Sequence, residues 1–256
     1  MVHLVTSPRR WTIAAVFVAF ALAVCVDIPV TDWVYSTGLS ATLKRHHILL
    51  LLTVRQLGSF PGFTLISAGI IFIMGPRWRP AAFFIALSGV LSGVSNFLKW
   101  FIGRRRPFNG GGLVERPFNG GGAFQLHPFA GGLHGLFGPN LSFPSGDVCL
   151  ATATALSLAI LFPSRRWICW CVIAIIGIER VIEGAHYPSD VVAGAALGWL
   201  CCEVSWRLLG KPRVPAPAAN APRPEIMAST PAEVQPPGVG KDAPAPAPAL
   251  LAEGSS

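Results

Sequence analysis

The stretch at residues 143–158, FPSGDVCLATATALSL, joins a few loop-forming residues to an apolar run that a lipid bilayer could bury. Ser145 and Gly146 favour the start of a helix, and Asp147 follows in what would be its first turn. An acidic side chain there can be ordinary capping chemistry, because the amino end of a helix carries a partial positive charge. Ionisable residues beside a membrane helix also mark functional sites. The stretch therefore predicts a helix start that is either a cap or part of a site.

The composition indicates a membrane protein. Hydrophobic residues make up 52% of the 256 residues, charged residues make up 12%, and the mean hydropathy is +0.54. Soluble globular domains carry about 25% charged residues. The formal net charge of +8 then indicates contact with membrane lipids or with phosphates. We expect no nucleic-acid partner, because no basic face interleaved with aromatic residues accompanies this charge, and the oligomeric state stays open.

Apolar segments predict an all-α, polytopic membrane bundle with about six transmembrane helices. The expected helices cover residues 11–26, 58–74, 81–102, 148–162, 167–182 and 191–209. Residues 32–57 contain several cations and predict an interfacial amphipathic stretch. The first segment, preceded by two arginines, also resembles a signal peptide. We favour a retained helix, because no polar mature region follows a small-residue cleavage site.

The basic residues predict how the chain is oriented. Four basic groups, at residues 9–10, 77–79, 165–166 and 207–213, fall on one side of a chain with six spans. The positive-inside rule makes that side cytoplasmic, together with both termini. The domain expected in the membrane covers residues 1–210. Residues 211–256 hold 11 of the 23 prolines and predict a disordered, Pro/Ala-rich cytoplasmic tail.

Polar residues converge on the opposite face of the predicted bundle, where cations break the positive-inside rule. They lie at the ends of four expected helices and in the loops between them: Lys99, Arg106, Ser145, Gly146, Asp147, Arg180, His186 and Asp190. Ionisable residues at such a depth are costly, which favours a functional interpretation. Separately, the cations could be snorkelling anchors, the serine a helix cap and the histidine merely exposed. Their joint placement favours a site.

The chemistry of this group suits phosphate. Guanidinium groups match phosphate oxygens, and the amino end of a helix accepts an anion. His186 and Asp190 are four residues apart and share a face on a helical turn. The carboxylate can hold one ring nitrogen and leave the other as a nucleophile.

At these residues the sequence resembles the type 2 phosphatidic acid phosphatase superfamily of membrane lipid phosphatases. Residues 99–107, KWFIGRRRP, match the family's first motif of Lys, six residues and Arg-Pro in full. Residues 144–147, PSGD, match the second motif, Pro-Ser-Gly-His, except at the last residue. Residues 179–190, ERVIEGAHYPSD, match the third motif except at the first residue, where the family has serine. The motif region spans residues 99–190, and the six-helix plan of the family would cover about residues 11–209.

The resemblance implies a metal-independent lipid phosphatase without a cofactor. His186 would attack phosphorus and form a phosphohistidine, with Asp190 orienting the ring. The phosphate oxygens would be held by Lys99, Arg106, Ser145, Gly146 and Arg180. Bacterial members act on phosphatidic acid, phosphatidylglycerol phosphate, undecaprenyl diphosphate or lipid A, and the loop before Phe143 favours members that act on lipid A. The protein would then lie in the bacterial inner membrane with its site facing the periplasm.

Two departures from the family motifs bear on activity. Asp147 stands where the family has the histidine thought to protonate the leaving group, and Glu179 adds negative charge beside a phosphate-binding arginine. Turnover and leaving-group preference are therefore open. The alternatives are a catalytically weak lipid-phosphate-binding protein and a phosphotransferase of the same fold. A small anion transporter is disfavoured, because the sequence shows no inverted repeats or broken helices.

Overall fold

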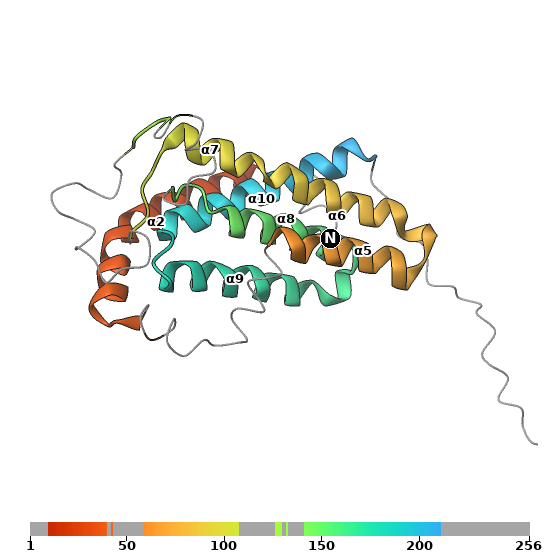
Figure 1. Cartoon of the computed structure of the whole chain (residues 1–256), viewed down its shortest axis with the longest axis horizontal. Helices are drawn as coiled ribbons and strands as arrows, with labels where there is room; N and C mark the ends of the chain where they lie inside the picture. Colours follow the sequence, from red (N-terminus) through yellow and green to blue (C-terminus); the bar gives the residue numbers. More distant parts are fainter. Residues whose placement is uncertain are drawn as a thin grey trace, which may run out of the picture. The chain divides into compact units, whose positions relative to one another are not determined.

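A computed structural model of the chain describes residues 10–39, 42, 59–107, 126–129, 132 and 141–210. Within these ranges the chain is helical and has no strand, so the predicted all-α bundle is confirmed (Figure 1). The α-helices are α2 (Arg10–Ser36), α5 (Phe60–Met74), α6 (Arg79–Ser92), α7 (Val94–Ile102), α8 (Gly146–Leu161), α9 (Arg166–Ile182) and α10 (Pro188–Leu208). The tail predicted over residues 211–256, and most of the predicted amphipathic stretch, lie outside the described residues.

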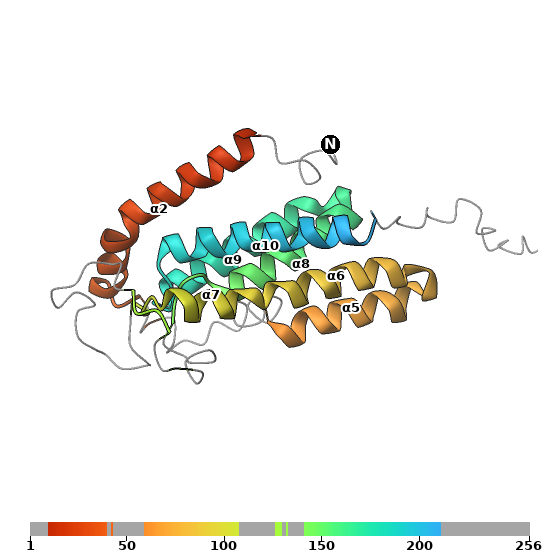
Figure 2. The same cartoon turned by 90° about the horizontal axis from the view of Figure 1, so that it is seen from above.

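Short proline-containing turns form two helical hairpins. The 3-10 turn η1 (Pro76–Trp78) joins α5 to α6, and η3 (Pro163–Arg165) joins α8 to α9. Proline is tolerated at the first position of such a turn, because the N–H that it lacks would have no partner there. Each pair of helices therefore runs antiparallel (Figure 2). α6 and α7 follow each other almost without a break and differ only by an interruption at Gly93.

The first helix is longer than the sequence predicted. The apolar run ends at residue 26, but α2 continues across Pro29 to Ser36. Asp27, the residue that follows the predicted segment, lies inside α2, where its side chain is fully buried and paired with Arg104. α2 changes direction in its carboxyl-terminal part (Figure 2), as expected where proline removes a backbone hydrogen bond.

The centre of the bundle is α8, which packs against α6, α9 and α10. Two glycines of α10 allow a close approach. A Cβ atom at Gly194 would lie 2.5 Å from the carbonyl oxygen of Ser145, and one at Gly198 would lie 2.3 Å from that of Cys149. Such small-xxx-small spacing is typical of tightly packed membrane helices. It brings the start of α10 against the start of α8.

The outer surface of the bundle is apolar. Large side chains such as Phe72 and Ile73 are more than four-fifths exposed, which suits contact with lipid. In the described part of the chain three helices are long and apolar enough to cross a membrane, Trp11–Ser36, Arg79–Ile102 and Pro188–Leu208, and two shorter apolar helices cover Phe60–Ile70 and Gly146–Leu161. The count of about six spans stays a prediction.

Candidate active site

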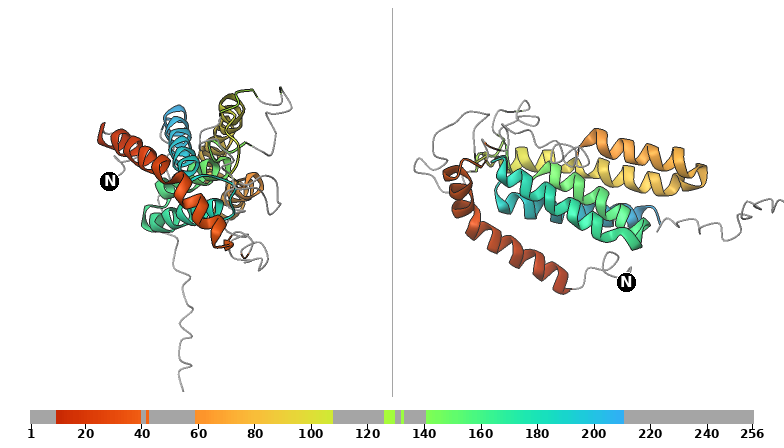
Figure 3. Two further views of the ribbon diagram at one scale, coloured as in Figure 1. Left: turned by 90° about the vertical axis from the view of Figure 1, so that its left-hand side faces the viewer. Right: turned by 90° about the horizontal axis from the view of Figure 1, so that it is seen from below.

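The structure brings the predicted site residues to one end of the bundle. α7 and α9 end there, and α8 and α10 begin there, at the left of Figure 1. The left-hand view of Figure 3 looks onto this end, where the carboxyl-terminal part of α2 crosses it. A backbone hydrogen bond of 3.0 Å from the N–H of Ser145 to the carbonyl oxygen of Asp190 joins the second motif to the third.

The histidine and aspartate of the third motif are buried side by side. His186 is 2% exposed, and its Nδ1 lies 3.7 Å from Oδ2 of Asp190. This separation is longer than a hydrogen bond, and Nδ1 has no hydrogen-bond partner among the described residues. Asp190 is held from two other directions. Its Oδ1 accepts from Arg104 at 2.5 Å, and its Oδ2 accepts from the backbone N–H of Tyr187 at 2.8 Å.

The environment of His186 disfavours its protonated form. Burial lowers the pKa of the His186 imidazole from its ordinary value of 6.5. The carboxylate of Asp190 opposes this shift, and the positive charges of Lys99 and Arg106 add to it. The ring is therefore held neutral, which is the form that can act as a nucleophile.

The amino end of α8 presents an anion-binding surface. Ser145 is at the N-cap position, but its hydroxyl makes no capping hydrogen bond and has no partner within the described part of the chain. A Cβ atom at Gly146 would lie 3.2 Å from Nζ of Lys99, so glycine leaves room for the ammonium group at the helix start. A buried, unpaired hydroxyl beside a cation and a helix amino end suits a bound anion.

The guanidinium of Arg180 is surrounded by carboxylates. Its Nε and one terminal nitrogen donate to the two oxygens of Glu179, both at 2.6 Å, and the other terminal nitrogen donates to Asp147 at 2.9 Å. Glu183 adds an ion pair at 2.5 Å. Asp147 therefore lies in the first turn of α8 and pairs with the residue that was predicted to bind phosphate.

Arg106 lies at the rim of this end of the bundle. It is half-buried, and its Nε donates a 3.4 Å hydrogen bond to the carbonyl oxygen of Leu141. The positive charges of Arg106 and Lys99 both lower the pKa of the His186 ring.

Three residues that the motif comparison did not select form a buried network behind the histidine. Arg104 donates to Asp190, to Asp27 at 2.7 Å and to the hydroxyl of Ser189 at 2.7 Å. The side chains of Asp27, Ser189 and Asp190 are fully buried, and Arg104 is 1% exposed. A lone aspartate in an apolar helix was the signal in the sequence that could have identified Asp27.

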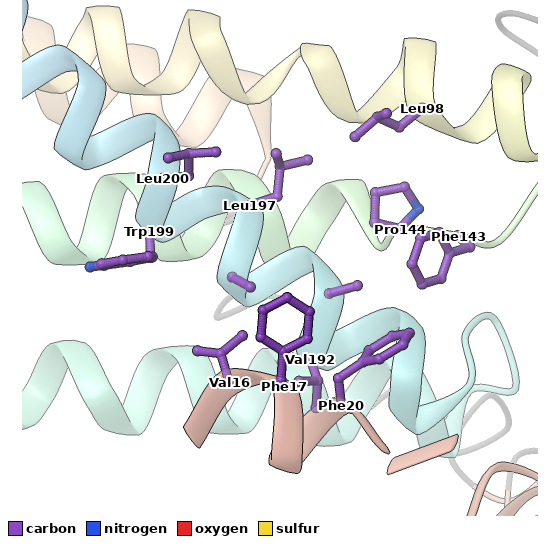
Figure 4. A pocket seen from close by; sticks show the side chains of 12 residues that line it. Val16, Phe17, Phe20, Leu98, Phe143, Pro144, Val192, Leu197, Trp199 and Leu200 are labelled. Carbon is purple, nitrogen blue, oxygen red and sulfur yellow. The ribbon is translucent and has the colours of Figure 1, made fainter. Parts of the chain in front are cut away.

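An apolar cavity of about 340 Å³ begins beside the site. Its wall includes Leu98 and Pro144, the chain neighbours of Lys99 and Ser145. Figure 4 shows Phe17 and Phe20 of α2 in its lining, together with side chains of α10: Val192, Leu197, Trp199 and Leu200. Phe20 also packs edge to face against Phe143, at 6.0 Å between ring centroids. The lining is almost wholly apolar, so the cavity suits a hydrocarbon chain.

The matched segment and this geometry define the class of protein. Residues 77–213 match the PAP2 superfamily, which is more than half of the chain, and the chain belongs to this family. With its apolar helices, it is a membrane protein.

Two curated proteins with different named activities are similar to this chain in sequence. Over 119 residues it is 41% identical to the lipid A 1-phosphatase of Rhizobium johnstonii, covering 45% of this chain and 41% of that protein. Over 63 residues it is 36% identical to the undecaprenyl-diphosphatase of Sulfolobus acidocaldarius, covering 24% of this chain and 31% of that protein. The matches thus span less than half of either relative.

A solved structure supports the fold. The crystal structure of the first transmembrane PAP2 type phosphatidylglycerolphosphate phosphatase from Bacillus subtilis has a TM-score of 0.50 and 19% sequence identity. The match covers 78% of this chain and 96% of that chain. At this identity the likeness concerns the fold.

Proposed function

We propose that this protein is an integral-membrane phosphatase that hydrolyses a phosphate monoester or diphosphate of a lipid, without a metal, through a phosphohistidine. The observation that carries the proposal is the neutral, buried His186 beside Asp190, next to the helix start at Ser145 and Gly146. The site would face the periplasm of a bacterial inner membrane, with both chain termini in the cytoplasm.

The first chemical step uses the geometry of the third motif. Asp190 lies 3.7 Å from Nδ1 of His186, so a proton on Nδ1 would face its carboxylate and leave the lone pair on Nε2. Nε2 attacks phosphorus, a P–N bond forms and the bond from phosphorus to the lipid oxygen breaks. Lys99, Arg106, Ser145, Gly146 and Arg180 would hold the phosphate oxygens, where charge develops in the transition state.

The leaving group departs at the end of the first step, and the second step then releases phosphate. The departing oxygen takes a proton from Asp147, or leaves without one when it belongs to a good leaving group such as a phosphate. Water then attacks the phosphohistidine and passes a proton to Asp147, the P–N bond breaks, and phosphate leaves with His186 back in its neutral form. In the structure Asp147 is paired with Arg180 at 2.9 Å.

The apolar cavity supports a lipid substrate. Because its wall begins at the chain neighbours of Lys99 and Ser145, a phosphate at the site would place its hydrocarbon chain in the cavity. Candidate substrates are phosphatidic acid, phosphatidylglycerol phosphate, undecaprenyl diphosphate and lipid A. The relatives named lipid A 1-phosphatase and undecaprenyl-diphosphatase favour the last two.

One observation favours a second candidate function. The carboxylates around Arg180 compete with a substrate phosphate for its donors. A protein whose cation is occupied in this way could bind lipid phosphates and turn them over slowly.

The test is phosphate release from a panel of these lipids by the purified full chain in detergent micelles. We expect release with wild type and a loss of at least ~1000-fold in kcat for His186→Ala, the effect of removing a nucleophile. EDTA should leave the rate unchanged. Binding without release would favour the second candidate, and inhibition by EDTA that a divalent ion reverses would contradict the metal-independent mechanism.

A further inference from the structure

We propose that Asp27 of α2 is a positioning residue for the reaction, acting on His186 through Arg104 and Asp190. The proposal rests on the proposed function, because it assigns a role in the same chemistry. Asp27 lies outside residues 77–213, the segment that matches the family. The end of the bundle that holds His186 would then be completed by α2, a helix that the family motifs do not include.

The carboxylate of Asp27 is bound on both oxygens. Its Oδ1 accepts the backbone N–H of Ser189 at 2.8 Å, and its Oδ2 accepts from Arg104 at 2.7 Å and from the Ser189 hydroxyl. These bonds join α2 to the first turn of α10, one residue before Asp190. The ion pair has side-chain exposures of 1% and 0%, so solvent does not screen it.

Arg104 transmits this contact to the histidine. One terminal nitrogen of its guanidinium binds Asp27 and the other binds Asp190, so the planar group bridges two carboxylates. The guanidinium also lies over the Tyr187 ring, 4.0 Å from its centroid. Its backbone is fixed by a 2.8 Å hydrogen bond from the N–H of Ser142 to its carbonyl oxygen. Arg104 thus cannot follow one carboxylate without leaving the other.

The charges explain why the second carboxylate matters. Asp27, Arg104 and Asp190 together carry one net negative charge, and Asp190 presents its share to Nδ1 of His186. Without Asp27, Arg104 would neutralise Asp190 alone and draw it away from the ring. The imidazole would lose both its orientation and part of the negative charge that favours its protonated form.

The experiment compares Asp27→Asn with Asp32→Asn, an exposed aspartate on the same helix. For Asp27→Asn we expect kcat to fall by about 10- to 100-fold, because the carboxylate that orients His186 would lose its support, with KM changing little. Asp32→Asn should match wild type. Thermal unfolding in detergent verifies that each variant is folded.

The pH profile separates positioning from packing. The groups that face His186 are Asp190, Lys99 and Arg106, and Asp27→Asn removes none of them. It should still move the acidic limb of kcat/KM to lower pH, because the weakened negative charge beside His186 stabilises the imidazolium less and lowers the pKa of the ring. An NMR titration with ¹⁵N-histidine, with the signal assigned by its loss in His186→Ala, should show the same shift in pKa.

The outcomes are distinct. A folded Asp27→Asn variant with wild-type kcat, or with reduced kcat but unchanged pH limb and His186 titration, overturns the proposal. If Asp27→Asn does not fold, Arg104→Lys replaces it, because an ammonium group cannot bridge two carboxylates as the fork does. That variant should also lower kcat and shift the titration, and an unshifted titration overturns the proposal. If wild type releases no phosphate but the titration shifts, the proposed function fails and the link from Asp27 to His186 stands.

Discussion

Replacing Glu179 with serine, the residue of the family's third motif, tests how far the carboxylates around Arg180 limit substrate binding. Glu179 accepts two hydrogen bonds of 2.6 Å from the guanidinium, and its side chain is 5% exposed. Serine would release both donors for a phosphate and remove one buried negative charge. Arg180 would keep Asp147 and Glu183 as partners, so it would not be left as an unpaired buried charge.

The magnitude follows from Coulomb's law. Two unit negative charges about 8 Å apart repel by ~2 kcal/mol at an effective dielectric constant of about 20. Relaxation and water entry reduce this, and ~1.4 kcal/mol corresponds to about tenfold in binding. We therefore expect Glu179→Ser to lower KM for a lipid phosphate by about tenfold.

The assay measures KM and kcat by phosphate release, with thermal unfolding to verify the fold. The matched control is Glu203→Ser, which breaks the pair of Glu203 with Arg207 near the opposite end of α10. Glu203→Ser should leave KM unchanged. A folded Glu179→Ser enzyme with the same or a higher KM would refute the reasoning that this carboxylate competes with the substrate.

Three further predictions concern proton transfer, pH and topology. Asp147→Asn should lower the rate on a monoester lipid and Asp147→His should raise it near neutral pH; an unchanged rate and pH profile for Asp147→Asn would reduce Asp147 to a structural role. Because burial lowers the pKa of His186 below 6.5, the acidic limb of kcat/KM should lie below pH 6.5. Below pH 6.5 the imidazole of His186 binds more protons in the unfolded chain than in the folded one, so its contribution to the free energy of unfolding should decrease as the pH falls. Denaturant titrations of wild type and His186→Gln at several pH values measure this contribution. A reporter fused after residue 209 should be cytoplasmic and one inserted within residues 107–143 periplasmic; the reverse would remove the inner-membrane orientation.

The sequence alone predicted the parts of the fold that depend on local pattern. Apolar length located the helices, because every span must satisfy its backbone hydrogen bonds internally. Proline and glycine marked the turns. The three motifs predicted polar residues gathered at one end of the bundle, and the structure has Ser145 and Arg180 at helix ends there and His186 in the loop between α9 and α10. The predicted first helix ends at residue 26, whereas α2 continues to Ser36. The sequence pattern does not show this continuation, because the residue that neutralises Asp27, Arg104, lies 77 residues away.

Contacts between residues far apart in the chain could not be predicted from the sequence. The motifs identify Arg180 as a cation beside Glu179, but the contact of Arg180 with Asp147 joins residues 33 apart and depends on how α8 packs against α9. The close approach of α10 to α8 likewise needs the packed positions of two glycines. Spacing predicts which residues share an end of the bundle, and packing decides which charges meet there.

These pairings show how two cations of this end of the bundle are held. Arg104 and Arg180 are bound to carboxylates, which explains how they tolerate burial. The positive charges of Lys99 and Arg106 act on His186, where they oppose protonation of the ring. The acidic partners are Asp27, Asp147, Glu179, Glu183 and Asp190, so five carboxylates face four cations in the described part of the site. A phosphate dianion would therefore enter a region that already has one excess negative charge. Binding then depends on Lys99, on the amino end of α8 and on loosening the carboxylates around Arg180, which is why Glu179 rather than the nucleophile should control KM.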